Sequence, residues 1–353
     1  MSPLIAQSPN NRVILGLMTF GPDEETGARI TDVAEFGKVL DIFQGRGYLE
    51  VDTARMYIGG KQEAFTRDVG WQKRGLTLAT KVQYPRGHGD NTADKVMASV
   101  ETSLTDLGTD KVDLLYLHAA DRGTPFAETL SAIDQLHKAG KFVNFGISNF
   151  TAFEVAEIIM TCKHNGWVRP TVYQAMYNAI TRSIETELVP ACRRYGLDIV
   201  VYNPIAGGLF SGKVKSKDMV PAEGRFSDSS ANLGKMYRSR YFKDSTFRAL
   251  KTVEEAVERH PGLTMIETAL RWTVHHSALR PASKGGNDGI IIGVSSAAQL
   301  EENLNNLEKG PLPDDVVKAL DEAWAINKGE TANYFHGVLE YGYDTREVLF
   351  GKK

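Results

Sequence analysis

Four residues that can take part in proton transfer stand at or just beyond the ends of short apolar runs. Asp52, Lys81 and His118 each close such a run, and Tyr57 follows Asp52 by five residues. Each residue alone has an ordinary structural explanation, as a helix cap, a solvated charge or a packed aromatic ring. Their shared position at successive run ends favours a catalytic role for the group.

These residue types match what the reduction of a carbonyl group needs besides a hydride donor. A tyrosine with its reference pKa of about 10 is a poor acid at neutral pH unless its phenolate is stabilised. The ammonium group of Lys81 would stabilise the phenolate, and Asp52 would hold the lysine in place and keep it protonated. His118 would hydrogen-bond the carbonyl oxygen and orient it. We therefore expect Tyr57 to be the proton donor of this site.

The elements that position these residues follow from the pattern of apolar residues. Short apolar runs flanked by Gly, Pro, Asn or Asp alternate with segments of helical period, such as the one that Asp32 would cap and those that Gly140 and Gly166 would end. This alternation predicts a parallel sheet with right-handed crossovers. Strands are expected at residues 13–17, 48–52, 76–81, 112–118, 143–148, 171–176, 199–202 and 289–293.

About eight strands is the number that a closed (β/α)8 barrel needs, and such a barrel carries its active site at the C-terminal ends of the strands. Ser148, Asn149 and Gln174 would then point to the same mouth as the four residues above. An open doubly wound sheet would show the same alternation. However, no G-x-G-x-x-G motif follows any of these runs, which argues against a dinucleotide-binding sheet of that kind.

Composition narrows the class of protein further. The 353 residues carry a formal charge of −3, which favours a small-molecule partner over nucleic acid or an anionic membrane. No apolar run approaches the length of a membrane span, and no secretory signal pattern opens the chain, so a cytoplasmic protein is expected. Cys162 and Cys192 are expected to be reduced, and no histidine has metal-ligand spacing, so no metal is expected.

Two segments depart from the alternation. Residues 203–244 form a long connection after the seventh strand, and a connection of this length within a compact domain is usually functional. Residues 329–353 form a tail that is rich in aromatic residues and has little apolar period. This tail could fold over the barrel mouth or be a solvated terminus. The whole chain, residues 1–353, is expected to form a single barrel domain.

At this point the sequence resembles the aldo-keto reductase superfamily. The segments VDTARMY, ATK and YLH match that family's tetrad of Asp, Tyr, Lys and His, and the match spans roughly residues 13 to 335. Further family segments follow in order: GISNF at 146–150, YQ at 173–174, YNPIAGGLFSGK at 202–213, and 293–303. The resemblance implies NADPH-dependent carbonyl reduction with Asp52, Tyr57, Lys81 and His118 as catalytic residues.

The resemblance also implies a set of residues that hold NADPH. Tyr202 would stack on the nicotinamide, and the segment from Ser295 to Asn303 would hold the adenosine end, although many family members place Lys and Arg where Gly293 and Gln299 stand here. The implied set is Met18, Thr19, Asp52, Ser148, Asn149, Gln174, Tyr202, Asn203, Pro204, Ile205, Gly207, Gly208, Leu209, Ser211, Gly212, Lys213, Arg225, Gly293, Ser295, Ser296, Gln299, Glu302 and Asn303.

Residues 207–213 also read G-x-x-x-x-G-K, the opening of a P-loop. Val214 follows where a P-loop carries a Ser or Thr hydroxyl for magnesium, so a nucleoside-triphosphate site is not expected. Glycine N–H groups and Lys213 would nevertheless suit a pyrophosphate.

Within the superfamily, the chain looks like the aflatoxin-aldehyde reductase subgroup. The resemblance rests on YNP at 202–204, YRSRY at 237–241 and NYF at 333–335, and it implies dialdehyde, dicarbonyl and semialdehyde substrates and a possible homodimer. His118, Tyr237, Arg240 and His336 would contact the substrate. His336 stands where the subgroup has an arginine that would grip a carboxylate, so a preference for succinic semialdehyde does not carry over.

Two other functions fit parts of this pattern. An NADPH-binding interaction module of the channel-β-subunit type would show the same barrel and little turnover. A Schiff-base aldolase or lyase would use Lys81 as its nucleophile.

Overall fold

The computed structural model describes residues 11–228 and 231–351. Eight strands pair in chain order, all parallel, and β8 closes on β1 to complete a barrel. The strands are β1 (Arg12–Gly16), β2 (Glu50–Asp52), β3 (Thr77–Lys81), β4 (Val112–Leu117), β5 (Phe142–Ser148), β6 (Val172–Met176), β7 (Asp198–Tyr202) and β8 (Gly289–Gly293). The predicted (β/α)8 barrel is confirmed, and the open doubly wound sheet is excluded. Each predicted strand is found, with ends that differ by at most a few residues.

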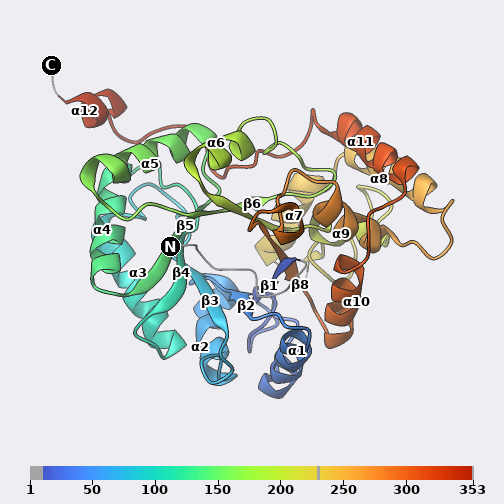
Figure 1. Ribbon diagram of the computed structural model, residues 1–353, viewed down its shortest axis with the longest axis horizontal. Helices are drawn as coiled ribbons and strands as arrows, with labels where there is room; N and C mark the ends of the chain where they lie inside the picture. The colour runs from blue at the N-terminus through green and yellow to red at the C-terminus, as the bar shows by residue number, and fades with distance from the viewer. Residues whose placement is uncertain (1–10, 229–230, 352–353) are drawn as a thin grey trace.

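Helices surround the ring of strands (Figure 1). They are α1 (Val33–Gly45), α2 (Gln62–Asp68), α3 (Ala93–Leu107), α4 (Phe126–Lys138), α5 (Ala152–Asn165), α6 (Leu188–Tyr195), α7 (Ala231–Tyr241), α8 (Asp244–Val257), α9 (Met265–His275), α10 (Ala297–Leu307), α11 (Asp314–Asn327) and α12 (Thr345–Phe350), with the 3₁₀ helices η1 (Tyr57–Gly60), η2 (Ala206–Ser211) and η4 (Ala282–Lys284). Asp32 caps α1 by accepting from the Glu35 N–H at 2.8 Å, and Gly166 ends α5 in the left-handed conformation, both as predicted.

Two apolar layers hold the barrel together. The inner layer consists of side chains that point into the barrel from six strands: Ile14, Ala79, Leu114, Tyr116, Val172, Val200 and Ile291. A larger layer lies between the strands and the helices. Because side chains alternate along a strand, Asp52, Lys81 and Gln174 continue the inward-facing rows of β2, β3 and β6. The strand pattern alone thus directs these polar residues into the barrel mouth.

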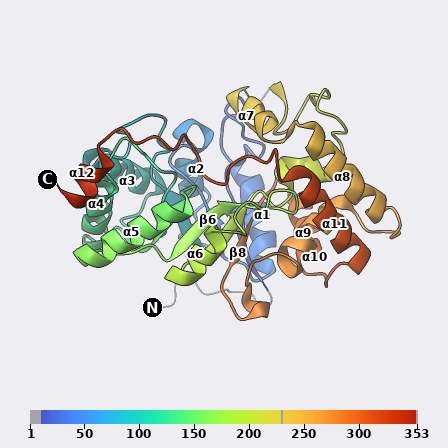
Figure 2. The ribbon, with the colours of Figure 1, turned by 90° about the horizontal axis from the view of Figure 1, so that it is seen from above.

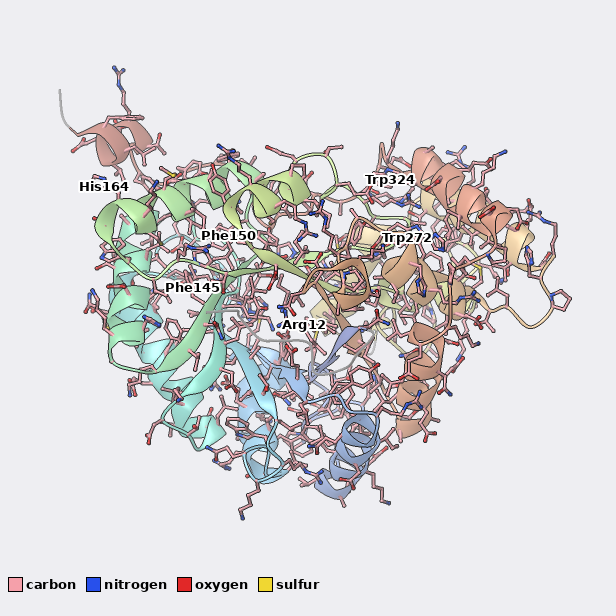
Figure 3. All side chains as sticks on the ribbon, viewed as in Figure 1. Arg12, Phe145, Phe150, His164, Trp272 and Trp324 are labelled. Carbon is pink, nitrogen blue, oxygen red and sulfur yellow. The ribbon has the colours of Figure 1, made fainter. Side chains whose placement is uncertain are left out.

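The other end of the barrel is closed by a buried ion pair. Arg12 and Glu50 are the first residues of β1 and β2, and Arg12 Nη2 lies 2.8 Å from Glu50 Oε2. Arg12 Nη1 also donates to the Asn287 carbonyl at 3.0 Å. Figure 3 shows Arg12 near the middle of the ring of strands. The pair occupies the N-terminal end of the barrel, so any site inside it opens at the C-terminal end.

The long connection after β7 contains more structure than composition indicated. It holds η2 and the helix α7, which the sequence did not predict. Tyr237 and Tyr241, four residues apart on α7, are both buried, and the ring of Phe226 contacts each of them at centroid distances of 6.0 and 6.3 Å. Tertiary packing of this aromatic pair stabilises a helix that has little apolar period of its own.

The C-terminal tail crosses the barrel mouth. Figures 1 and 2 show the segment after α11 running across the molecule to α12, at the end that holds α4 and α5. His336 N–H donates to the Asn149 carbonyl at the end of β5, at 3.1 Å, and Tyr334 is buried. The sequence left open whether the tail folds over the barrel mouth or is a solvated terminus. Residues 334–342 fold over the mouth, whereas α12 buries no residue. In the described part of the chain, no helix combines the length and apolar character needed to cross a membrane.

Candidate active site

The four predicted catalytic residues meet at the C-terminal mouth of the barrel. Lys81 Nζ is fully buried and donates to Asp52 Oδ1, and it also donates to the Thr53 carbonyl at 2.7 Å and to the Tyr57 hydroxyl at 3.4 Å. It lies 5.0 Å from the centre of the Tyr57 ring. The ammonium group is thus fixed between a carboxylate, a carbonyl and a phenol. An amine held in this way has no free face for covalent attack on a substrate, which argues against a lyase.

Burial dominates the acid–base properties of Tyr57 and Lys81. Burial raises the pKa of Tyr57 well above its usual value, and the Asp52 carboxylate raises it further. Burial also lowers the pKa of Lys81, although Asp52 opposes that shift. The sequence interpretation gave Lys81 the leading influence on the Tyr57 phenol. In the structure the loss of solvent outweighs it, so Tyr57 holds its proton firmly until negative charge develops nearby.

His118 faces the same space from the end of β4. Its ring makes edge contacts with Tyr57, at a centroid distance of 5.9 Å, and with Tyr84, at 5.2 Å. Burial lowers its pKa well below the usual value, and Lys81 and His336 add to the shift, so the imidazole is neutral. Its Nδ1 is buried and has no hydrogen-bond partner within residues 11–228 and 231–351. A neutral imidazole in this place can orient a carbonyl oxygen without competing to protonate it.

Amides from neighbouring strand ends brace the group. Gln174 Nε2 donates to Asp52 Oδ2 at 2.9 Å, so both carboxylate oxygens of Asp52 are engaged. Asn149 Nδ2 donates to the His118 carbonyl and to Ser148 Oγ, each at 2.9 Å. The Tyr202 hydroxyl donates to Asn149 Oδ1 at 2.8 Å. These residues, all in the predicted cofactor set, therefore brace the tetrad at two points: Gln174 holds Asp52, and Asn149 holds the backbone of His118.

Backbone strain gathers at this mouth. The described residues other than glycine that adopt positive φ are Ile58, Asn149, Asn203 and Ala206, with φ of 50°, 64°, 66° and 51°. All follow a strand end that carries predicted site residues. Such a conformation costs roughly 1–2 kcal/mol for an ordinary side chain, and strain of this kind concentrates at functional sites. Ile58 directly follows Tyr57, so its left-handed backbone helps to set the direction of the phenol.

The glycine-rich turn after β7 does not direct its N–H groups as the sequence predicted. The Gly207 N–H donates to Asn203 Oδ1, the Gly208 N–H to the Ile205 carbonyl and the Gly212 N–H to the Leu209 carbonyl. These three donors are used inside the turn, so the expectation that they would cradle a pyrophosphate is not met by this conformation. Lys213 is exposed, and Pro204, Leu209 and Ser211 complete the turn.

The predicted adenosine side has an open arrangement. Ser295 N and Oγ both donate to Gln299 Oε1 at 2.9 Å, and Ser296 Oγ caps α10. Gly293 and Glu302 are exposed, whereas Asn303 is buried. On the facing side, Arg225 Nη1 donates to the Tyr237 hydroxyl at 2.9 Å and contacts Met18 Sδ at 3.6 Å, and Thr19 Oγ1 donates to the Val294 carbonyl at 2.6 Å. These groups come from β1, β8 and the connection after β7.

The cations at this end of the barrel are not neutralised by the protein. Lys213, Arg225 and Arg240 have no carboxylate partner in the described parts of the chain, although most other buried or half-buried arginines there are paired. Of these, Arg225 lies against Gly293 at the end of β8, just before Ser295, Ser296 and Gln299, and an unpaired cation there fits a ligand that carries phosphates. The donor set is therefore compatible with a dinucleotide cofactor. No cluster of His, Cys, Asp or Glu suited to a metal ion is found among the described residues.

Comparison with known proteins decides the family. The family model described as "Aldo/keto reductase family" matches residues 12–325. The chain belongs to the aldo/keto reductase family. An aldo-keto reductase of Pseudocercospora fijiensis is 42% identical over 301 residues, which cover 84% of this chain and 100% of that protein. Aflatoxin B1 aldehyde reductase member 2 of Rattus norvegicus is 42% identical over 330 residues, covering 91% of this chain and 87% of that protein. The aldo-keto reductase pigE of Monascus ruber is 38% identical over 343 residues, covering 93% and 99%.

These relatives confirm the family and the subgroup that the sequence indicated. This aldo-keto reductase is therefore an oxidoreductase.

Its predicted substrate residues lie together above His118. Arg240 Nη2 lies 3.1 Å from His336 Nε2, and the Arg240 guanidinium lies 5.7 Å from the centre of the Tyr237 ring. Tyr237 itself is buried beneath Arg225 and Arg240, so it supports the arginines instead of facing the mouth.

Sequence reasoning missed the residues that hold the tail of this aldo-keto reductase. Arg122 forms a buried, two-pronged ion pair with Glu154 and donates through Nη1 to the His336 carbonyl at 2.6 Å. Tyr341 also donates to Glu154, at 2.8 Å. Arg122 stands in no motif, Glu154 belongs to the Thr151–Glu154 capping box that opens α5, and only the fold brings them to residue 336. Tyr84, which lies between His118 and His336, was missed for the same reason.

Proposed function

We propose that this aldo-keto reductase reduces aldehydes to alcohols with NADPH, and that Tyr57 is the proton donor. Dialdehydes, dicarbonyls and semialdehydes are the proposed substrate class. The observation that supports the proposal best is the buried Lys81 ammonium held between Asp52, the Thr53 carbonyl and the Tyr57 hydroxyl. The name of the rat relative, an aldehyde reductase, supports the same chemistry.

Each residue of the tetrad has one proposed role in the reduction. The substrate carbonyl oxygen accepts a hydrogen bond from the Tyr57 hydroxyl, and the neutral His118 orients it. When bound, NADPH supplies the hydride that adds to the carbonyl carbon. Tyr57 gives its proton to the oxygen as negative charge develops there, and the alcohol forms. Lys81 lies 3.4 Å from the phenol oxygen and stabilises the phenolate left behind, while Asp52 fixes Lys81.

The cofactor would be held by the groups at the same mouth. Tyr202, Asn149, Ser148 and Gln174 lie beside the tetrad and are the proposed partners of the nicotinamide end. At the other end, Arg225 and Lys213 are the proposed partners of the phosphates, with Ser295 and Gln299 at the 2′-phosphate. The other residues of the predicted cofactor set are proposed as further contacts, apart from the N–H donors of Gly207, Gly208 and Gly212, which the turn uses internally.

A single assay tests this proposal. Purified protein is mixed with NADPH or NADH and a panel of aldehydes that includes dialdehydes and dicarbonyls, and the loss of absorbance of the reduced cofactor is followed. We expect turnover with NADPH, faster than with NADH, and alcohol products. Cofactor binding, seen as a change in protein fluorescence, without turnover of any aldehyde would overturn the enzyme proposal in favour of an interaction module.

The proposal also includes the organisation of the protein. We propose that residues 1–353 act as one domain, with residues 334–342 of the 329–353 tail completing the mouth, and that the protein forms a homodimer in a cytoplasmic setting. Sedimentation velocity at micromolar concentration measures the oligomeric state, and a single monomer boundary would refute the dimer.

A further inference from the structure

Tyr84 is a polar residue at the barrel mouth that no motif assigns. It follows β3, three residues after Lys81, and its ring lies edge-on to His118 at a centroid distance of 5.2 Å. Its hydroxyl lies 3.0 Å from His336 Nδ1. Tyr84 therefore stands between the residue proposed to orient the reacting carbonyl and the tail that crosses the mouth.

The hydrogen-bond directions around His336 follow from elementary chemistry. Arg240 Nη2 lies 3.1 Å from His336 Nε2, and a guanidinium can only donate. His336 Nε2 must therefore carry a lone pair, so the proton of the neutral ring is on Nδ1. Nδ1–H then donates to the Tyr84 hydroxyl. The oxygen of Tyr84 is the acceptor in that bond, so its own O–H is left for another partner.

The protonation of His336 agrees with this assignment. Its side chain is half-buried, and the loss of solvent together with the charges of Arg240 and Arg122 lowers its pKa to about 3. A neutral ring at physiological pH is the form that the geometry requires.

The backbone of His336 is fixed from two sides. Its N–H donates to the Asn149 carbonyl at 3.1 Å, and its carbonyl accepts from Arg122 Nη1 at 2.6 Å. Arg122 is itself locked by Glu154 through two hydrogen bonds of 2.7 and 3.0 Å. The imidazole is therefore presented to Tyr84 by rigid elements at the ends of β4 and β5, and its direction does not depend on a free chain end.

The Tyr84 O–H has no acceptor among residues 11–228 and 231–351. The ring beside it belongs to His118, so a small molecule whose carbonyl contacts His118 and Tyr57 has its neighbouring atoms close to Tyr84. We propose that Tyr84 is a specificity-determining residue that donates a hydrogen bond to a second oxygen on the substrate, next to the reacting carbonyl, and that His336 is the positioning residue that fixes this donor.

This inference rests on the proposed aldehyde reduction and predicts how substrates are ranked. A neutral hydrogen bond to a bound ligand contributes the equivalent of roughly a three- to tenfold change in affinity. An aldehyde with an adjacent oxygen gains that contribution, and an alkanal of the same length does not. Tyr84 and His336 thus act on the ratio of kcat/KM values for the two substrates, mainly through KM.

The matched substrates 2-oxobutanal and butanal test this. We expect Tyr84→Phe to lower the kcat/KM ratio of 2-oxobutanal to butanal roughly three- to tenfold, with little change for butanal. His336→Leu removes the donor to Tyr84 and should lower the ratio in the same direction, whereas His336→Asn, whose amide N–H can replace Nδ1–H, should restore it. Tyr195→Phe, at the end of α6, is the matched control and should leave the ratio unchanged.

The double variant Tyr84→Phe/His336→Leu separates positioning from a general structural role. If His336 acts through Tyr84, the double variant has the same ratio as Tyr84→Phe alone. An unchanged ratio in Tyr84→Phe, with both aldehydes still reduced, overturns the inference and leaves the proposed function intact. Equal losses on both aldehydes also overturn it, because they show a structural role. If the unmodified enzyme reduces neither aldehyde, the proposed function itself fails, and the inference with it.

Discussion

The Asp52–Lys81 pair gives the sharpest quantitative prediction. Both side chains are almost fully buried, and Asp52 is the only carboxylate that lies against the ammonium among the described residues. Asp52→Asn keeps the size and one acceptor oxygen but leaves the Lys81 charge with only neutral partners, the Thr53 carbonyl and the Tyr57 hydroxyl. Removing one partner of a buried ion pair costs about 3–5 kcal/mol, so we expect the variant to lose that much unfolding free energy at pH 7.

The sign of the pH dependence follows from Lys81. Its folded pKa is already below its ordinary value, and without Asp52 it falls further. The unfolded chain then binds a proton that the folded protein does not, so the stability of the variant should rise as pH increases toward about 10, over a wider range than in the unmodified protein. Removing both charges in Asp52→Asn/Lys81→Met should restore much of the loss.

Urea denaturation between pH 6 and 10, followed by circular dichroism, measures these quantities. Three curves are needed: the unmodified protein, Asp52→Asn and the double variant. A loss below about 1 kcal/mol in Asp52→Asn, or a double variant that is less stable than Asp52→Asn, would contradict the reasoning, because either result means that Lys81 is not an uncompensated buried charge.

Three other predictions concern catalysis, cofactor choice and pH. Tyr57→Phe keeps the ring contacts with His118 and Lys81 but removes the proton donor, so kcat should fall by about 10²–10⁴-fold. The affinity for NADPH, measured by fluorescence titration, should stay unchanged. A kcat within threefold of the unmodified enzyme would show that another group is the acid. Gln299→Arg places a cation beside Ser295 and should tighten NADPH binding about tenfold relative to NADH binding. This preference for NADPH should fall as the salt concentration increases. Equal gains in affinity for both cofactors would refute the assignment of Ser295 and Gln299 to the 2′-phosphate. The pKa values of His118 and His336 are lowered in the folded protein, so as pH falls below about 6.5 the unfolded chain binds protons that the folded protein does not. The unfolding free energy should therefore decline by roughly 1 kcal/mol per histidine per pH unit between pH 6 and 5. In His336→Asn the unfolding free energy should decline less steeply with falling pH than in the unmodified protein.

The sequence predicted the barrel and the tetrad because both depend on local pattern. A buried parallel strand must be apolar, and a polar residue at its end is visible in the sequence itself, as with Asp52 and Lys81. The family segments then placed the residues around Asn149 and Tyr202. These parts of the site need no knowledge of long-range contacts.

The rest of the site depends on contacts between distant segments. Arg122 has no distinctive neighbours in the sequence, and Glu154 reads only as part of a helix capping box; their importance follows from the 2.6 Å bond that Arg122 makes to residue 336. The same holds for α7, which forms because Tyr237 and Tyr241 pack on Phe226. The donors of Gly207, Gly208 and Gly212 were assigned to phosphate because a glycine-rich spacing does not reveal that the turn uses them internally.

The strap from Tyr334 to Gly342 has a consequence for how this enzyme changes by mutation. The four predicted catalytic residues are encoded between residues 52 and 118, whereas His336, the residue proposed to direct Tyr84 toward a substrate, is encoded in a separate and much later segment. Reaction chemistry and substrate choice would thus be separated along the gene. Substitutions in the strap are expected to redirect the enzyme to a different carbonyl compound without touching the residues proposed to perform the reduction.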